Sequence, residues 1–345
     1  MRPADALSVP VRLTTSVLVV AACLAACSGS EDPTEDGATE RDLSPSVTSP
    51  SVATESLPDP TPTTPATPTE STTPAPPRPA TFQLASALRT VRILALRFGP
   101  REAASPAYAE AADWVEQRFD AYGYDVRRQP VHVPAGNSWG IDVDSGTTTN
   151  VVATRPGFDP TEPHLVVSAH LDTVPQAPGA EDDASGISVL LELARMSAQD
   201  ETRLPVVFVA FGGEEPRGNG DALHHFGSRA MVARMPADQR AAVAGMVSMD
   251  RVGVGTVVPV CTAGTQPPTV RGQLIRAGVR AGVPTLACVN ASSDHESFDE
   301  AGMPAARVGG TSYAGYHSAA DLPAVINPPQ LRRVGVLMWT WLTGL

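Results

Sequence analysis

The stretch VVSAHLDTVPQAPGAEDDASGI, residues 166–187, leads from an apolar run to a histidine and then to three consecutive acids. His170 and Asp172 are two residues apart, so their side chains point to the same side of an extended chain. The acids at positions 181–183 follow in a loop rich in proline, glycine and alanine. Because neighbouring carboxylates repel one another, the sequence predicts a compensating positive group beside this loop.

The segment 81–345 alternates between helix-like and strand-like patterns and forms the expected folded domain. In one predicted helix Ser105 is the N-cap and Pro106 the first helical residue. The alternation is typical of an α/β fold, and we expect a three-layer α/β/α sandwich with a mixed, mostly parallel central sheet. The predicted helices cover 84–99, 105–123 and 186–198, and the predicted strands cover 124–134, 150–157, 164–170, 205–215, 241–250 and 304–310.

Side chains that suit a metal follow three of the predicted buried strands. His170 and Asp172 come after LVVSA, Glu214 and Glu215 after VVFVAFGG, and Asp250 after GMVSM. In open α/β sheets, ligands bind beyond the carboxyl ends of the strands. Three strand ends of this kind predict one shared site.

A further histidine, His317, lies near the C-terminus in YAGYHSAADLP. Taken in order, the segments SAHLD, GAEDDASG, FGGEE, SMD and YHSAAD resemble the motifs of the co-catalytic di-zinc aminopeptidases, metallopeptidase family twenty-eight. The resemblance extends over about residues 84–342. It implies a metalloexopeptidase that hydrolyses N-terminal residues from peptides with two Zn²⁺ ions per chain.

The resemblance also implies which residues bind the metals. One zinc would be held by His170, Asp182 and His317, and the other by Asp182, Glu215 and Asp250, with the Asp182 carboxylate shared by both. Family members often have a cis peptide bond after the bridging aspartate. A cis Asp182–Asp183 bond is therefore expected, although such bonds are rare without proline.

Other residues take catalytic or supporting roles in this resemblance. Glu214 would be the general base that takes a proton from water and passes it to the leaving amine. Asp172 would orient His170. Tyr316 would help to stabilise the oxyanion. Asp294 and His295 match a family position that lies either behind the metal ligands or in the pocket.

Other functions are considered beside this one. A related di-zinc amidohydrolase or carboxypeptidase carries an inserted dimerisation domain, but only 35 positions separate Glu215 from Asp250. Glutaminyl cyclases use one zinc and lack part of the ligand set, whereas His170 and Asp250 are both present here. An inactive lipoprotein that only binds peptides would not need Glu214 beside a complete ligand set.

An adjacent pair of histidines and a pair of cysteines lie outside the proposed ligand set. His224 and His225 are adjacent, so they do not share a face of a helix or strand, and we do not expect them to bind a metal together. Cys261 and Cys288 lie in the predicted exported domain, where they either form a disulfide or remain two buried thiols.

The first 27 residues are typical of an export signal. Arg2 and Arg12 precede an apolar stretch of about fourteen residues, which is too short to span a bilayer. The stretch ends in LAAC, which resembles the bacterial lipobox and makes Cys27 the expected lipidation site, with VAAC at Cys23 as a weaker match. The alternative is an ordinary secretory signal.

Residues 28–80 are expected to form a disordered tether. They contain 12 of the 34 prolines and nine acidic residues against two arginines. Such a composition cannot bury a core. We therefore expect an exported protein that is lipid-anchored on the outer face of the bacterial cell membrane, or else secreted.

The charge of the chain excludes one class of partner. The formal net charge is −12, and every basic residue other than histidine is arginine. An acidic chain of this kind does not attract nucleic acid electrostatically. The expected partners are peptide substrates and the membrane, and we expect a monomer.

Overall fold

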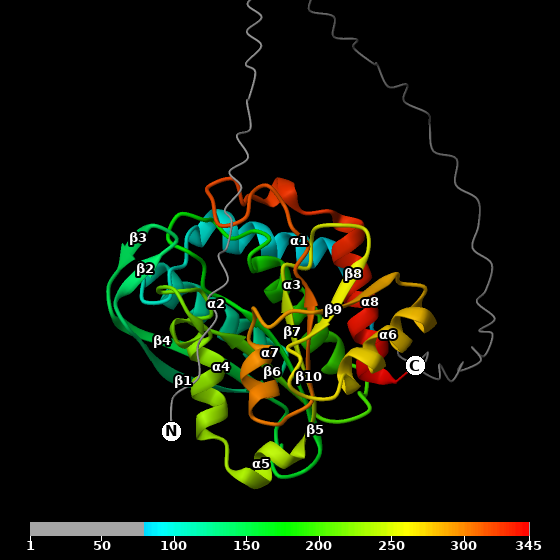
Figure 1. Cartoon of the computed structure of the whole chain (residues 1–345). Coiled ribbons are helices and arrows are strands. Elements are labelled where there is room, and N and C mark those ends of the chain that lie inside the picture. Colours follow the sequence, from blue (N-terminus) through cyan, green and yellow to red (C-terminus); the bar gives the residue numbers. More distant parts are fainter. Residues whose placement is uncertain (1–78, 345) are drawn as a thin grey trace, which may run out of the picture. The chain divides into compact units, whose positions relative to one another are not determined.

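The computed structural model describes residues 79–344 of the chain, and Figure 1 shows the arrangement of its elements. The expected signal peptide, the lipidation site Cys27 and nearly all of the expected tether lie outside the described residues. Within 79–344, no helix is both long and apolar enough to span a bilayer.

An eight-stranded sheet forms the centre of the domain (Figure 1). Its spatial order is β1-β4-β6-β5-β7-β10-β8-β9. The strands β6, β5, β7 and β10 run parallel, whereas β4 pairs antiparallel with β1 and β6, and β8 pairs antiparallel with β10. The predicted mixed, mostly parallel sheet is confirmed. The strands are β1 Asp125–Val133, β4 Gly146–Thr154, β5 His164–His170, β6 Val206–Phe211, β7 Val243–Asp250, β8 Val258–Thr262, β9 Thr285–Val289 and β10 Ala305–Gly309, with a separate hairpin of β2 Gly136–Ser138 and β3 Ile141–Val143.

Helices cover both faces of this sheet, because alternate strand residues point to opposite sides. Leu165 and Val167 of β5 join a large core with α1, α2, α3, α6 and α8, whereas Val166 joins a smaller core with Met231 of α4 and Phe298 of α7. The two cores make the predicted three layers. The helices are α1 Leu84–Arg92, α2 Pro106–Ala121, α3 Ala184–Ser197, α4 Phe226–Arg234, α5 Ala237–Ala242, α6 Thr269–Ala281, α7 His295–Glu300 and α8 Pro328–Thr343, with short helical turns η1 Ile93–Phe98, η2 Asp221–Leu223 and η3 Pro323–Val325.

The predicted helix ends agree with the structure. Ser105 caps α2, and its side chain accepts a hydrogen bond from the backbone N–H of Tyr108 at 3.1 Å. Pro106 occupies the first helical position, where a missing N–H costs nothing. The first helix continues through Phe98, as predicted, but its last six residues are π-helical.

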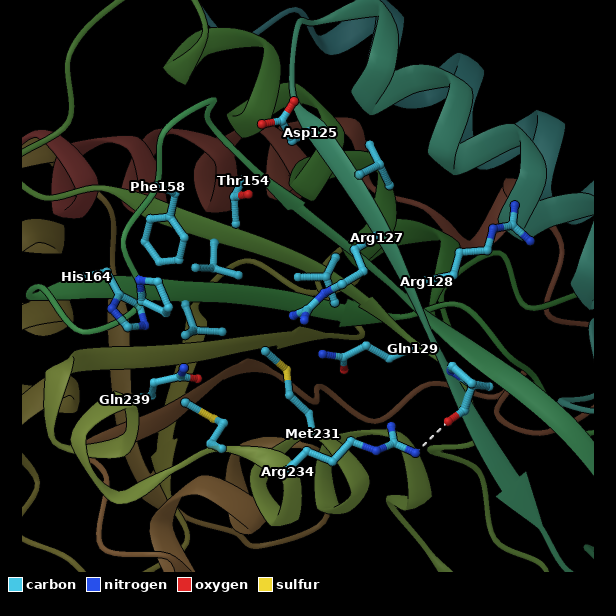
Figure 2. A pocket seen from close by; sticks show the side chains of 17 residues that line it. Asp125, Arg127, Arg128, Gln129, Thr154, Phe158, His164, Met231, Arg234 and Gln239 are labelled. Atoms are coloured by element: carbon cyan, nitrogen blue, oxygen red, sulfur yellow. Dashed lines mark hydrogen bonds between the residues drawn. The ribbon is translucent and has the colours of Figure 1, made fainter.

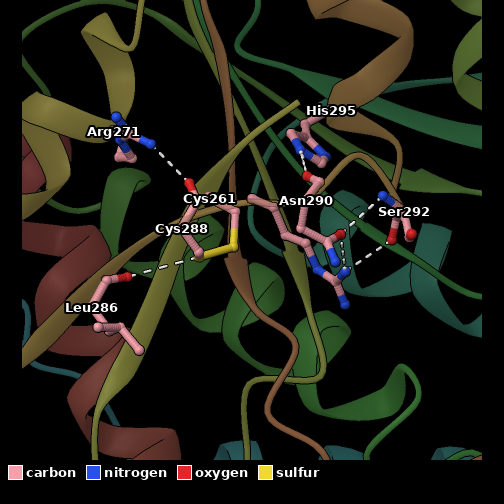
Figure 3. The surroundings of a disulfide bond; sticks show 8 residues. Cys261, Arg271, Leu286, Cys288, Asn290, Ser292 and His295 are labelled. Atoms are coloured by element: carbon pink, nitrogen blue, oxygen red, sulfur yellow. Dashed lines mark hydrogen bonds between the residues drawn. A yellow bond between two sulfur atoms is a disulfide. The ribbon is translucent and has the colours of Figure 1, made fainter. Parts of the chain in front are cut away.

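A disulfide joins β8 and β9, the two neighbouring strands at one edge of the sheet (Figure 3). Cys261 of β8 and Cys288 of β9 are direct neighbours in the parallel pair, and their Cα atoms are 4.3 Å apart. Of the two alternatives open from the sequence, the disulfide is therefore the one present. It ties the edge strand β9, where Leu286 and Val289 are exposed, to the sheet.

A cavity of about 590 Å³ lies on the sheet face beside β1, β4 and α4 (Figure 2). Apolar side chains that include Val166 and Met231 line it, together with Arg127 and Arg234. None of the predicted site residues lines this cavity. The site lies at the other end of the central strands, since Val166 is near the start of β5 and His170 is at its end.

Candidate metal centre

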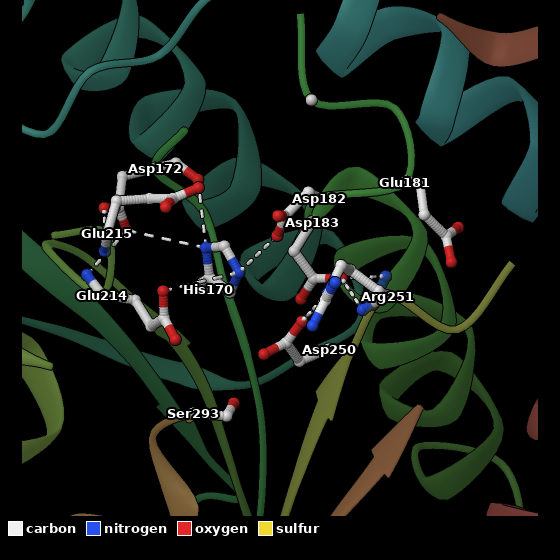
Figure 4. Close-up of polar contacts among 12 residues, drawn as sticks. His170, Asp172, Glu181, Asp182, Asp183, Glu214, Glu215, Asp250, Arg251 and Ser293 are labelled. Carbon is white, nitrogen blue, oxygen red and sulfur yellow. Dashed lines mark hydrogen bonds and ion pairs between the residues drawn. The ribbon is translucent and has the colours of Figure 1, made fainter. Parts of the chain in front are cut away.

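The carboxyl ends of three adjacent strands bring the predicted ligands together (Figure 4). His170 is the last residue of β5, which lies between β6 and β7. Glu214 and Glu215 follow β6 after a glycine pair, and Asp250 is the last residue of β7. The two other predicted ligands come from loops, Asp182 from the β5–α3 loop and His317 from the segment after β10.

Carboxylates crowd this end of the sheet without enough arginine to balance them. Arg101, Arg251 and Arg307 are the guanidinium groups that lie among them in the described chain. A buried carboxylate that lacks a partner costs several kcal/mol, so each must find donors, a proton or a cation. Nine of the buried carboxylates in the described residues lie here, namely Asp172, Glu181, Asp182, Asp183, Glu214, Glu215, Asp250, Asp294 and Asp321.

Four of these carboxylates are held by backbone N–H groups, with two different donors for each. The N–H to oxygen distances lie between 2.8 and 3.1 Å. None of the four lines the cavity described next. They are therefore structural acids that shape the loops. The pairings are Asp172 with Glu214 and Glu215, Glu181 with Gly253 and Val254, Asp183 with Gly186 and Arg251, and Asp321 with Glu181 and Asp182.

Four other carboxylates, Asp182, Glu214, Glu215 and Asp250, line a cavity of about 210 Å³. Among the described residues none of them accepts a hydrogen bond from a backbone N–H through its side chain, and Glu215 Oε1 is buried with no hydrogen-bond partner. Their partners are histidine and arginine side chains. These four carboxylates are thus the ones available to a cation.

Asp182 lies between the two predicted histidine ligands. Its Oδ1 is 3.1 Å from His170 Nε2, and its Oδ2 is 3.1 Å from His317 Nε2. Glu215 Oε2 is also 3.2 Å from His317 Nε2, and donor atoms of His170 and Asp250 belong to one compact group within 4.8 Å. A carboxylate with one oxygen toward each histidine suits the predicted bridge.

The expected division of ligands between the two metals stays a prediction. The two histidines face different oxygens of Asp182. Donor atoms of His170 lie within 4.8 Å of those of Asp182 and Glu215 in one group, and of those of Glu214 and Asp250 in another. His317 contacts Asp182 and Glu215, so its contacts favour Glu215 as a ligand of the same ion.

The predicted role of Asp172 also differs in detail. His170 Nδ1 donates a hydrogen bond to the backbone carbonyl of Asp172 at 3.1 Å, whereas the nearer carboxylate oxygen is 3.9 Å away. Because a carbonyl can only accept, Nδ1 carries the hydrogen and Nε2 faces the cavity. The Asp172 carboxylate instead fixes the backbone of Glu214 and Glu215, so it positions the next strand end.

The expected cis peptide bond between Asp182 and Asp183 is present. The Asp183 side chain then caps α3 by accepting from the N–H of Gly186. A Cβ at position 186 would overlap the Asp183 carboxylate and the backbone of Met249, so only glycine fits. The acids at 181–183 therefore divide into one cavity-facing aspartate and two loop-forming neighbours.

Arg101 is a structural cation that the sequence did not indicate. It is fully buried, and its guanidinium donates only to backbone carbonyls. It thus joins the ends of the loop between β5 and Asp182 and places a positive charge behind the acids. No local motif marks this role, because its partners are distant carbonyls. They belong to Leu94, Gly99, Leu171, Pro178 and Gly179.

Two further arginines contact Asp250. Arg307 NH2 lies 3.0 Å from its Oδ1, and Arg251 Nε lies 3.4 Å from the same oxygen. Within residues 79–344, these contacts use only Oδ1 of Asp250. Arg307 could have been suspected from the sequence, since a charged residue inside the apolar strand β10 requires a buried counter-charge.

Electrostatics of the cluster follow from burial and these contacts. Burial would raise the pKa of Asp182, but hydrogen bonds from His170 and His317 outweigh it and hold that pKa well below its usual range. Burial raises the pKa of Glu215 to about 7. Burial opposes charge on His317, yet Glu215 and Asp182 raise its pKa to about 10. His170 likewise has a pKa well above its usual value, because Glu214 and Asp182 outweigh burial.

Aromatic side chains form one wall of the cavity. Tyr316 stacks on His317 with ring centroids 3.7 Å apart, and the guanidinium of Arg251 lies 4.4 Å from the Tyr316 ring centroid. Trp139, between β2 and β3, meets His317 edge-on at 4.4 Å. Tyr316 lines the cavity, as its predicted role requires, whereas Trp139 was not foreseen.

Asp294 and His295 lie behind the cavity and do not line it. Both are fully buried, and the two carboxylate oxygens of Asp294 have no hydrogen-bond partner among the described residues. Burial, with the nearby charge of Glu214, raises the pKa of Asp294 to about 7. Both residues thus lie outside the cavity lining, and a supporting role behind the metal ligands stays a prediction.

The donor set suits divalent metal ions. Imidazole nitrogens and carboxylate oxygens are ligands that zinc prefers. Donor atoms of His170, Asp182 and Glu215 lie within 4.8 Å of one another, and so do those of His170, Glu214 and Asp250. Two divalent cations would supply the positive charge that the arginines do not provide and a partner for the bare oxygen of Glu215.

Comparison with known proteins agrees with this site. The sequence profile of peptidase family M28 matches residues 150–342, which is more than half of the chain. The chain belongs to peptidase family M28. This M28 chain is 27% identical to leupeptin-inactivating enzyme 1 of Streptomyces exfoliatus over 269 residues, which make up 70% of the chain and 57% of that enzyme.

Solved structures share the M28 fold. A zinc aminopeptidase from Bacillus subtilis superposes with a TM-score of 0.68 at 19% identity, over 76% of this chain and 95% of the other. A Bacteroides thetaiotaomicron glutaminyl cyclase bound to N-acetylhistamine superposes with a TM-score of 0.65 at 18% identity, over 76% and 98%. The same fold thus carries different reactions, and the side chains of the site must decide between them.

Zinc binding should release protons at pH 7. The metal-free site favours protonated histidines, since carboxylates raise the pKa of His317 to about 10 and that of His170 well above its usual value, whereas a metal binds neutral imidazole. Titration calorimetry with Zn²⁺ in two buffers of different ionisation enthalpy should give clearly different heats, and zinc affinity should fall as the pH is lowered. The variant His317→Gln should release fewer protons. Equal heats in both buffers would contradict this description of the site.

Proposed function

We propose that this M28 protein is a zinc-dependent aminopeptidase that binds two Zn²⁺ ions. The proposal rests on one observation above all. Four buried carboxylates without backbone donors line one cavity, and two histidines face the shared carboxylate Asp182. A binding protein for peptides would have no need to gather uncompensated acids and metal-type histidines in one place.

The contacts of the two histidines support one division of the ligands. His170 contacts Asp182 and shares a donor group with Asp250, so these three would hold one ion. His317 contacts Glu215 and the same Asp182, so these three would hold the other. Bound zinc lowers the pKa of water and polarises the scissile carbonyl of a peptide. The protein supplies the orientation, because backbone N–H groups fix Asp172 and the loop of Asp182.

Glu214 is the carboxylate that moves the proton. It lines the cavity, and its Oε2 lies 3.9 Å from His170 Nε2. Its donor atoms lie near those of His170 and Asp250, but the proposed division of zinc ligands does not include it. Burial would raise its pKa, but the nearby histidines His170 and His225 outweigh burial and lower the pKa to about 2. An ionised Glu214 can accept a proton from the attacking water and deliver it to the leaving amine. The Tyr316 hydroxyl would face the developing oxyanion.

The relatives, rather than the charge of the cavity, support an aminopeptidase over a carboxypeptidase. Two Zn²⁺ ions would balance the four carboxylates that line the cavity, so the charge of these acids does not select between an amino and a carboxyl terminus. A zinc aminopeptidase from Bacillus subtilis shares the fold of this M28 chain.

A panel of substrates tests the reaction class. Aminoacyl-nitroanilides with a free amino group should be hydrolysed, and their N-acetylated forms should show kcat/KM lower by about 10²-fold or more, because the amino group loses its charge. Release of a C-terminal residue from N-blocked dipeptides measures carboxypeptidase activity, and cyclisation of glutaminyl peptides measures the cyclase reaction. Cleavage of blocked substrates alone would contradict the proposal.

We further propose that the protein is exported and anchored through lipid on Cys27. The lipobox-like LAAC and the acidic, proline-rich segment after it support this proposal. The full chain, expressed in a bacterium that processes lipoproteins, should fractionate with membranes, and Cys27→Ser should remove it from that fraction. Wild-type protein found entirely in the culture medium would favour the secreted alternative.

A further inference from the structure

His225 occupies an unexpected place beside Glu214. The sequence offered it only as half of an adjacent histidine pair unsuited to binding one metal. In the structure its side chain is 3% exposed, and its Nε2 lies 3.4 Å from Glu214 Oε1. The other ring nitrogen, Nδ1, lies 3.0 Å from Glu296 Oε2 on α7. The imidazole therefore sits between two carboxylates from separate elements.

The backbone holds His225 in this place. Its N–H donates to the carbonyl of Glu214 at 3.0 Å, and the N–H of Phe226 donates to the carbonyl of Gly213 at 2.7 Å. These hydrogen bonds join the two ends of the segment between β6 and α4. His225 adopts a left-handed backbone conformation with φ of 55°, which disfavours a side-chain-bearing residue. The fold thus accepts a small local cost and keeps the imidazole against Glu214.

Glu214 has few groups that could hold its carboxylate in one orientation. Its carboxylate accepts nothing from the backbone, and among the described residues His225 Nε2 is the nearest positively charged group, ahead of His170 Nε2 at 3.9 Å. Donor atoms of Glu214 also lie within 4.8 Å of those of His170 and Asp250. A freely rotating Glu214 could therefore join the metal ligands and stop acting as a base.

We propose that His225, supported by Glu296, is a positioning residue that holds the Glu214 carboxylate in place for proton transfer and away from the metal ions. The inference rests on the proposed hydrolytic function. His225 engages Oε1, which leaves Oε2 directed to the inner cavity. His225 lines the cavity but would act through Glu214, and Glu296 lies outside the cavity lining.

A double-mutant cycle tests the proposal. His225→Ala should lower kcat by about 10²-fold with little change in KM, since it acts through a residue whose general-base role contributes about 10²- to 10⁴-fold. In a Glu214→Gln background the same change should cost less than about 2-fold, because the two residues act as one unit. Zinc content should be unchanged in all variants. Glu296→Gln should give a smaller loss of kcat, and His225→Asn, which can still donate to Glu214, should recover part of it.

A matched control separates positioning from general damage. His164 is another buried histidine, at the opposite end of β5 from His170, where its Nδ1 hydrogen-bonds to the Glu162 carbonyl. His164→Ala should lower thermal stability but leave kcat of the folded, zinc-loaded enzyme unchanged. An equal fall in kcat for both histidine variants would overturn the proposal.

A readout other than activity completes the experiment. Co²⁺ in place of zinc gives a visible spectrum that depends on the number of ligands, so release of Glu214 onto the metal in His225→Ala should change that spectrum. An additive cycle or an unchanged spectrum would overturn the positioning role. A wild-type protein that cleaves no peptide would overturn the proposed function instead, and the cobalt spectrum would still report the position of Glu214.

Discussion

The compensation of buried negative charge determines how this domain is built around its site. Backbone N–H groups satisfy four carboxylates, and in doing so they fix the loops that carry the others. Asp321 holds the backbone of Asp182, and Asp172 holds the backbone of Glu214 and Glu215. These two structural acids therefore position functional ones, and the charge left over at the cavity attracts metal ions.

The fold supplies the meeting point. Three parallel strands place His170, Glu214 and Asp250 at the carboxyl ends of the strands. The buried guanidinium of Arg101 holds the ends of the loop that brings Asp182 to them. Rigid strands set the distances between donors, whereas the loops set their directions. This division explains why a chain only 19% identical to a zinc aminopeptidase shares its fold.

The sequence predicted the elements that carry a strong local pattern. Apolar runs that end in His170 or Asp250 predicted both the strands and their shared edge, and Ser105 predicted a helix start. It could not predict which ligands share a metal, because that depends on the loop geometry around Asp182. Arg101 and His225 also escaped prediction, since their partners are distant in the chain and neither belongs to a recognisable motif.

If metal rather than protons alone compensates the cavity acids, the purified protein should contain and need zinc. Metal analysis of the purified full chain can be combined with thermal unfolding before and after chelation. We expect close to two zinc ions per chain and a lower melting temperature after chelation, restored when Zn²⁺ is returned. A folded protein that takes up no zinc when it is supplied, and whose melting temperature does not respond to chelation, would contradict this expectation.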